Sequence, residues 1–206
     1  MERFRRTRRP AHPLPVRVMH WVGAGAIITM MLSGWEIYNA SPSLPFTFPG
    51  WATLGGWLAG AIAWHISAMW VLFADGLAYL GYGFFSGHFR RDIRPKGLRA
   101  LARDVGAALS FRLGHRLGHY NAVQRLLYAG VILALCVQVA TGLAIWKPVQ
   151  LGWLTGFFGG YPAARFIHLA MMLCIAGFLA VHLVLVALFP RTLVSMVATL
   201  EAEDEP

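Results

Sequence analysis

The sequence contains very little cysteine, and the two cysteines it has are far apart. Cys136 and Cys174 are the only ones among 206 residues, and each stands alone inside an apolar run. This spacing excludes a CxxCH motif for covalent haem and the paired cysteines of a zinc site. A redox cofactor, if there is one, must be held by other side chains without a covalent bond.

Charge is also scarce. Charged residues make up 13% of the chain and hydrophobic residues 57%. Four apolar windows are long enough to cross a hydrocarbon layer about 30 Å thick at about 1.5 Å per residue. They are residues 16–38, 54–85, 122–146 and 163–189. The sequence therefore predicts an all-α integral membrane four-helix bundle over residues 16–190, with a basic segment 1–15 before it and a tail 191–206 after it.

The first window follows a basic start, as a signal peptide does. It is long, however, and carries His20 and Trp21 at its start, which a secretion signal does not need. We therefore expect a retained helix.

The net charge of +9 is unevenly placed along the chain. Lysine and arginine are concentrated before the first window and between the second and third, whereas residues 39–53 have none. By the positive-inside rule, both termini are expected in the cytoplasm of a bacterial inner membrane, and this placement argues against nucleic-acid binding. Within the basic connection, residues 94–113 have the period of an amphipathic helix, which we expect to lie on membrane lipid at the cytoplasmic surface.

Four of the eight histidines fall inside the predicted spans, where an ionisable side chain is costly and needs a partner. By topology, His20 and His182 lie near the cytoplasmic side, whereas His65 and His168 lie in the outer halves of their spans. Fourteen residues separate His168 from His182, so both share one helix face about 21 Å apart. Two histidine pairs at two depths suit two b-type haems, because neutral imidazole is a good axial ligand of haem iron.

Two haem-free roles are also compatible with histidines in a membrane. Buried histidines can be hydrogen-bonded between helices of a scaffold, or can line the proton path of a transporter. One histidine alone would favour these alternatives. The matched pairs favour haem.

Arg17 and Arg165 each precede a membrane histidine by three residues and so share its face, one turn nearer to water. A guanidinium group there suits a haem propionate. An arginine that snorkels at a helix end gives the same pattern. Gly34, fourteen residues after His20, is expected at the level of the outer pair, where it leaves room for a porphyrin edge. The sequence shows no convincing internal repeat.

Several segments resemble the bacterial cytochrome b561-like superfamily. They are RVMHW at 17–21, WH at 64–65, HYNAVQRLLY at 119–128 and the H-x13-H of the fourth span. The most similar branch contains the di-haem cytochrome b (cytochrome b/b6 domain) subunits of formate dehydrogenases, nickel-iron hydrogenases and thiosulfate reductases. SGWEIYNASP, LAIWKPVQL and FGGYPAAR resemble stand-alone cytochromes found beside periplasmic molybdopterin oxidoreductases. The long carboxy-terminal, partner-binding extension of the anchor subunits is missing, which leaves the partner open.

The resemblance implies ligands for two haem b groups. His20 and His182 would bind the iron on the cytoplasmic side, and His65 and His168 the iron on the periplasmic side.

The resemblance also implies a quinone site near the cytoplasmic haem, formed partly by the YN-x-x-Q segment. Here these residues are Tyr120, Asn121 and Gln124, whose amide groups can bond a quinone carbonyl. A capping asparagine with polar neighbours has the same appearance.

The expected function is transmembrane electron transfer between a periplasmic redox partner and ubiquinone or menaquinone. The partner is expected to be a molybdopterin oxidoreductase or a c-type cytochrome. Direction is not encoded in these residues, so the chain would be an oxidoreductase subunit that either reduces quinone or oxidises quinol. A superoxide:quinone oxidoreductase of the same superfamily is the alternative, and a homodimer is compatible with either.

Overall fold

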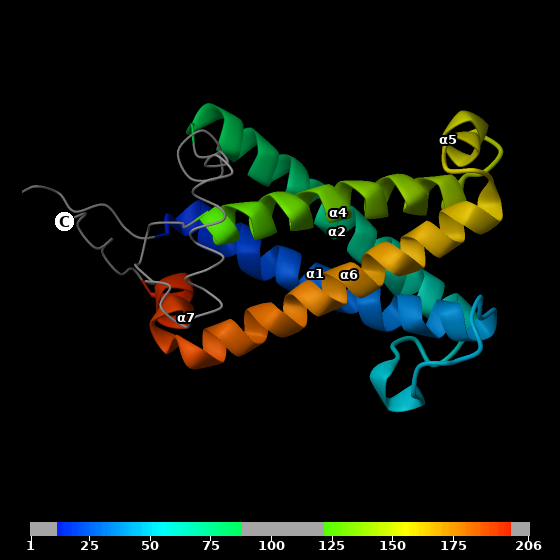
Figure 1. The fold of residues 1–206 in the computed structure, drawn as a ribbon, viewed down its shortest axis with the longest axis horizontal. Coiled ribbons are helices and arrows are strands. Elements are labelled where there is room, and N and C mark those ends of the chain that lie inside the picture. Colours follow the sequence, from blue (N-terminus) through cyan, green and yellow to red (C-terminus); the bar gives the residue numbers. More distant parts are fainter. Residues whose placement is uncertain (1–11, 88–121, 199–206) are drawn as a thin grey trace, which may run out of the picture. The chain divides into compact units, whose positions relative to one another are not determined.

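The computed structural model describes residues 12–87 and 122–198, which are helical and contain no strand (Figure 1). The elements are α1 (Leu14–Ala40), the short 3-10 helix η1 (Gly50–Ala52), α2 (Leu58–Phe85), α4 (Ala122–Trp146), α5 (Gly152–Phe157), α6 (Tyr161–Leu188) and α7 (Pro190–Val197). In α1, α2, α4 and α6 the apolar stretch is long enough to cross a membrane. The predicted all-α fold with four membrane-length helices is confirmed, and the chain is a multi-pass membrane protein.

The helix boundaries lie close to the predicted windows. The third window, 122–146, coincides with α4, and the other three differ from α1, α2 and α6 by at most four residues at either end. The sequence did not predict η1, α5 or α7. The expected amphipathic helix at 94–113 lies outside the described residues, as do residues 1–11 and the end of the tail.

The described residues fall into two compact units. In the first, α1 and α2 pack against each other as an antiparallel hairpin. In the second, α4 and α6 form another antiparallel hairpin, with α5 packed against both and α7 against α6. Each hairpin therefore brings side chains of two long helices together.

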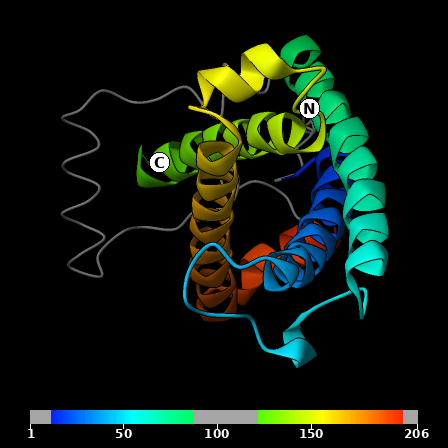
Figure 2. The ribbon, with the colours of Figure 1, turned by 90° about the vertical axis from the view of Figure 1, so that its right-hand side faces the viewer.

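The loop of the first hairpin joins the end of α1 to the start of α2 (Figure 2), and polar and aromatic contacts hold it. The Asn39 amide nitrogen donates to the Phe48 carbonyl, and the Phe48 N–H donates to Asn39 Oδ1, both at 2.8 Å. The Phe48 ring stacks on Trp35 at 4.7 Å between centroids. Gly55 then turns the chain into α2 with a φ of +119°, where a Cβ would collide with the backbone of Ala61. These contacts fix where α2 begins relative to α1.

The loop of the second hairpin uses a similar turn. Thr155 of α5 donates to the Ala144 carbonyl of α4 at 3.0 Å, which ties the loop helix to the end of α4. Gly160, with a φ of +96°, precedes the first residue of α6, and Pro162 occupies its first turn, where a missing N–H costs nothing. The start of α6 is thereby set against α4.

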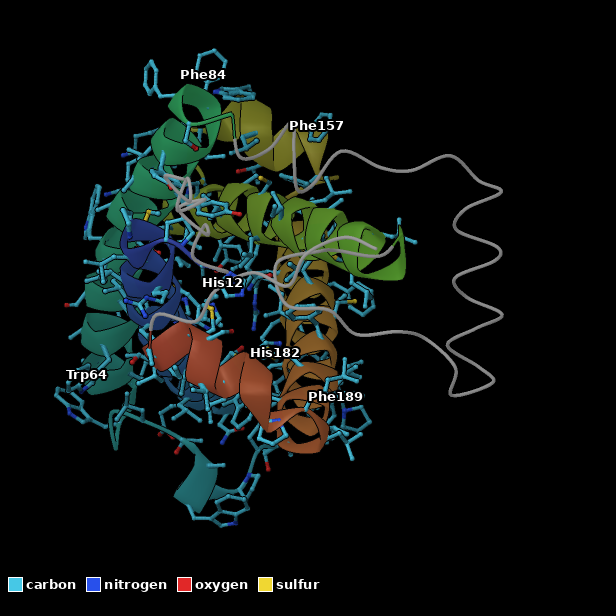
Figure 3. The ribbon with its side chains drawn as sticks, turned by 90° about the vertical axis from the view of Figure 1, so that its left-hand side faces the viewer. His12, Trp64, Phe84, Phe157, His182 and Phe189 are labelled. Carbon is cyan, nitrogen blue, oxygen red and sulfur yellow. The ribbon has the colours of Figure 1, made fainter. Side chains whose placement is uncertain are left out.

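Small residues lie inside the hairpins, and many large apolar residues lie on their outer surfaces. Ala61, Ala144 and Ala164 have no exposed surface. Trp64 on α2 and Phe84 near its end project away from the helix, with 53% and 79% of their surface exposed (Figure 3). Close packing through small residues is the usual way in which membrane helices associate, and the exposed apolar side chains suit lipid.

Candidate functional site: a cradled histidine in each hairpin

His65 is held inside the first hairpin by groups from α1. Its Nδ1 atom lies 3.0 Å from the Met30 carbonyl oxygen and 3.2 Å from Ser33 Oγ. A carbonyl oxygen can only accept a hydrogen bond, so Nδ1 carries the proton. The Ser33 hydroxyl donates to the Thr29 carbonyl at 2.6 Å and has lone pairs left to accept from Nδ1–H. The lone pair of the imidazole is therefore on Nε2.

Gly34 makes room for this imidazole. A Cβ built on Gly34 would lie 3.3 Å from His65 Cε1, closer than ordinary carbon contacts. Gly34 does lie at the level of the outer histidine, as expected. The group that uses the space left by its missing side chain is the His65 ring, whereas the sequence suggested a porphyrin edge.

His168 is held inside the second hairpin in a similar way. Its Nδ1 atom lies 3.0 Å from Thr141 Oγ1, whose hydroxyl donates to the Val137 carbonyl at 2.8 Å. On the other side of the ring, the Gln138 amide nitrogen lies 3.1 Å from Nε2. An amide nitrogen can only donate, so Nε2 accepts and Nδ1 carries the proton. Both hairpins thus set the same tautomer.

Gly142 stands beside His168 as Gly34 stands beside His65. A Cβ on Gly142 would lie 3.2 Å from His168 Cε1. Ser33, Gln138, Thr141 and Gly142 were not predicted from the sequence. Ser33, Thr141 and Gly142 have a common signal, a hydroxyl residue followed by glycine in both the first and the third spans, whereas Gln138 has none.

The two inner histidines lie in the same helices or units as the outer ones. His20 is fourteen residues before Gly34 on α1, and His182 is fourteen residues after His168 on α6. The His182 ring stacks on Phe178 at 6.0 Å, and the His20 ring meets Trp21 edge-on at 5.4 Å. Each unit therefore carries one outer and one inner histidine, separated by the same helical rise. The pairing of the histidines stays a prediction, because each expected haem would take one histidine from each unit.

Arg17 presents unused hydrogen-bond donors next to the His20 turn. Its Nε and Nη1 atoms are buried and have no hydrogen-bond partner in the described part of the chain. A buried guanidinium without a partner is costly, and a carboxylate is the group that it binds best. This observation fits a haem propionate. Arg165 lies in the first turns of α6, three residues before His168.

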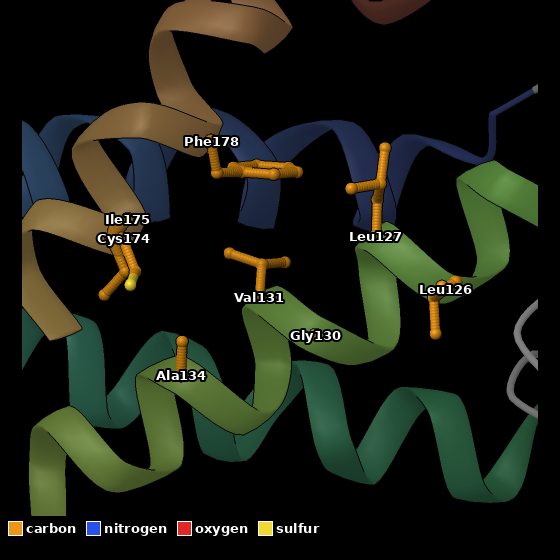
Figure 4. Close-up of a pocket in the computed structure, with 8 residues that line it drawn as sticks. All are labelled: Leu126, Leu127, Gly130, Val131, Ala134, Cys174, Ile175 and Phe178. Carbon is orange, nitrogen blue, oxygen red and sulfur yellow. The ribbon is translucent and has the colours of Figure 1, made fainter. Parts of the chain in front are cut away.

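An apolar pocket opens between α4 and α6. Its volume is about 320 Å³, and its lining residues are Leu126, Leu127, Gly130, Val131, Ala134, Cys174, Ile175 and Phe178 (Figure 4). Phe178 is also the residue that stacks on His182. The pocket therefore borders the environment of an inner histidine. Tyr120 and Asn121 lie outside the described residues, as does the side chain of Gln124.

His65 and His168 each have a hydrogen-bond arrangement that suits binding of a metal cofactor through Nε2. An imidazole whose Nδ1–H is hydrogen-bonded within the protein offers Nε2 to a metal, which is the usual arrangement around metal-binding histidines. A metal at His168 Nε2 would take the place of the Gln138 hydrogen bond. The family profile of prokaryotic cytochrome b561 matches residues 11–198. The chain belongs to this family. It is a membrane b-type cytochrome that transfers electrons, and haem b is its cofactor.

Curated relatives of this cytochrome are subunits of redox enzymes. It is 46% identical over 187 residues to the putative protein-methionine-sulfoxide reductase subunit YedZ1 of Azospira oryzae. The aligned region covers 90% of this chain and 94% of the relative. It is 27% identical over 186 residues to a probable Ni/Fe-hydrogenase B-type cytochrome subunit of Cupriavidus necator, covering 82% of this chain and 74% of the relative. A subunit of the same name from Bradyrhizobium diazoefficiens is 26% identical over 172 residues, covering 75% and 66%.

Proposed function

We propose that this cytochrome carries electrons across the inner membrane between the quinone pool and a periplasmic oxidoreductase, by means of two haem b groups. The observation that carries the proposal is the matched pair of units. Each has an outer histidine whose lone pair is on Nε2. On α6 the inner histidine His182 is fourteen residues from His168, and on α1 the inner histidine His20 is fourteen residues from Gly34, the glycine beside His65.

Equal spacing in both units supports the pairing. Fourteen residues of helix rise about 21 Å, so each unit would supply one histidine at each of two depths in the proposed bundle. In this arrangement His65 and His168 are the axial ligands of the outer haem, and His20 and His182 those of the inner haem. Bound haem supplies one-electron transfer between ferric and ferrous iron, at potentials set by the ligands and their surroundings.

The positions of the arginines and of the apolar pocket support the rest of the site. Arg17, with its two unpaired donor atoms, binds a propionate of the inner haem, and Arg165 has the corresponding role near His168. Asn121 and Gln124, with Tyr120 beside them, bind the quinone head group. The pocket begins at Leu126, two residues beyond Gln124 on the same helix, and its apolar lining suits the hydrocarbon part of a quinone.

The similarity to a methionine-sulfoxide reductase subunit favours one direction of electron flow. A reductase consumes electrons, so this chain would oxidise quinol at the cytoplasmic side and supply a periplasmic reductase of the molybdopterin type. Both termini are then cytoplasmic, as the distribution of arginine and lysine predicts.

Haem content and ligand substitution test the proposal. Acid acetone extraction and pyridine haemochrome quantitation of the purified protein should give about two haem b per chain, because there are two bis-histidine sites. His20→Ala or His182→Ala should remove one spectral component, and His65→Ala or His168→Ala the other. A single haem per chain, or loss of the same component in His20→Ala and His65→Ala, would show that the pairing is wrong.

A further inference from the structure

The two hairpins repeat one arrangement of side chains that the sequence alone does not make evident. His65 and His168 each lie seven residues after the first residue of their helix. Four residues before each histidine is an alanine with no exposed surface, Ala61 or Ala164. A pair of glycines with positive φ precedes each of the two helices. The outer histidines therefore occupy equivalent places in two equivalent hairpins.

The partner helix of each hairpin repeats as well. Ser33 and Gly34 of α1 meet His65, and Thr141 and Gly142 of α4 meet His168. In each case the hydroxyl contacts Nδ1 and the glycine leaves room for Cε1. Both hydroxyl side chains have no exposed surface. Each hydroxyl also donates to the carbonyl four residues earlier in its own helix, so its hydrogen points away from the histidine.

This geometry makes both hydroxyl oxygens acceptors for the Nδ1–H of the imidazole. A hydrogen bond from the far nitrogen of a ligating histidine fixes its orientation and raises its basicity toward the metal. A more basic ligand stabilises ferric iron relative to ferrous iron, which lowers the reduction potential. Hydrogen bonding of this kind is one of the means by which a protein adjusts a haem potential.

We propose that Ser33–Gly34 and Thr141–Gly142 are a duplicated positioning device that holds His65 and His168 as ligands of one haem and lowers the potential of its iron. This inference rests on the proposed haem ligation by the two outer histidines. It adds the residues that set the orientation, the tautomer and the ligand strength of those histidines, and it assigns the same role to both halves of the chain.

Thr141→Val tests the device with little change of volume. The substitution removes the acceptor at 3.0 Å from His168 Nδ1 and keeps the branched shape of the side chain. In a redox titration of the purified protein, we expect the outer haem to titrate at a more positive potential while the inner haem is unchanged. The ferric-to-ferrous equilibrium should shift by up to about tenfold, which is about 59 mV for a one-electron couple.

Three further variants separate the role of the hydroxyl from general effects on structure. Thr141→Ser restores the acceptor and should restore the potential. Thr29→Val removes a hydroxyl on α1 that bonds the Gly25 carbonyl four residues earlier, so it should leave both potentials as in the wild type. Ser33→Ala should shift the outer haem in the same direction as Thr141→Val, moderated by the Met30 carbonyl that remains 3.0 Å from His65 Nδ1.

A positive shift, or loss of the outer haem, in Thr141→Val together with normal behaviour of Thr141→Ser supports the hydroxyl as the positioning group. Two haems with wild-type potentials in Thr141→Val would overturn the proposed device, and so would equal loss of haem in Thr141→Val and Thr141→Ser. Failure of the proposed function itself is seen separately, because the wild-type protein would then lack two bis-histidine haems before any substitution is made.

Discussion

Replacing Gly142 or Gly34 by alanine measures how closely each histidine is packed against its neighbouring helix. The new Cβ would lie 3.2 Å from His168 Cε1 or 3.3 Å from His65 Cε1. Ordinary carbon contacts are about 3.5–4.0 Å, so the imidazole must move by a few tenths of an ångström. Overpacking of this kind costs about 1–3 kcal/mol, and the better helix propensity of alanine returns up to about 1 kcal/mol. The net destabilisation is therefore about 0–3 kcal/mol. In the proposed site, the displaced ring would also bind iron less well.

Haem retention during heating is a direct assay for this effect, with haem content measured before and after. Gly25→Ala is the matched control, because it lies on α1 and a Cβ there meets no atom within 4 Å. We expect Gly25→Ala to behave as the wild type, and Gly142→Ala and Gly34→Ala to release the outer haem at a lower temperature. Identical haem content and release temperature in all three variants would show that His65 and His168 are not closely packed against Gly34 and Gly142.

Three other predictions concern the inner side of the membrane. Arg17→Gln should weaken binding of the inner haem while the outer haem stays bound, because it removes a charged partner for a propionate; equal retention of both haems would assign Arg17 to the lipid interface. Asn121→Ala and Gln124→Ala should each slow haem reoxidation by a soluble quinone analogue about tenfold, since a lost hydrogen bond costs about 1–3 kcal/mol. Haem content is the control. Unchanged rates in both variants would place the quinone elsewhere. Quinol added to inner membranes should reduce the haem, and a periplasmic reductase should then reoxidise it; reduction that occurs only when a periplasmic donor is supplied would reverse the proposed direction.

The four long helices and their approximate ends could be predicted from the length and position of the apolar runs. In hydrocarbon each backbone polar group must be bonded within its own helix, so a long apolar run leaves the chain little choice of secondary structure. The window 122–146 matches α4 for this reason. The short helices α5 and α7 were missed because they have no such length and depend on contacts with α4 and α6.

The four membrane histidines also stood out in the sequence, because an ionisable residue inside a membrane span is rare and costly. The spacing of fourteen residues between His168 and His182 on one helix predicted ligands at two depths. The family followed from motifs that surround these same histidines, and the match over residues 11–198 confirmed it.

The sequence was therefore enough to identify the membrane class, the four spans and the histidines worth considering as ligands. Which nitrogen of His65 and His168 carries the proton, and which keeps the lone pair, follows only from the folded hairpins. Serine, threonine and glycine are common in membrane helices, and their presence in α1 and α4 gave no reason to connect them with histidines 27 or 32 residues away. That connection arises when the hairpin closes, because the distance and direction between two side chains depend on how the helices pack and not on either helix alone.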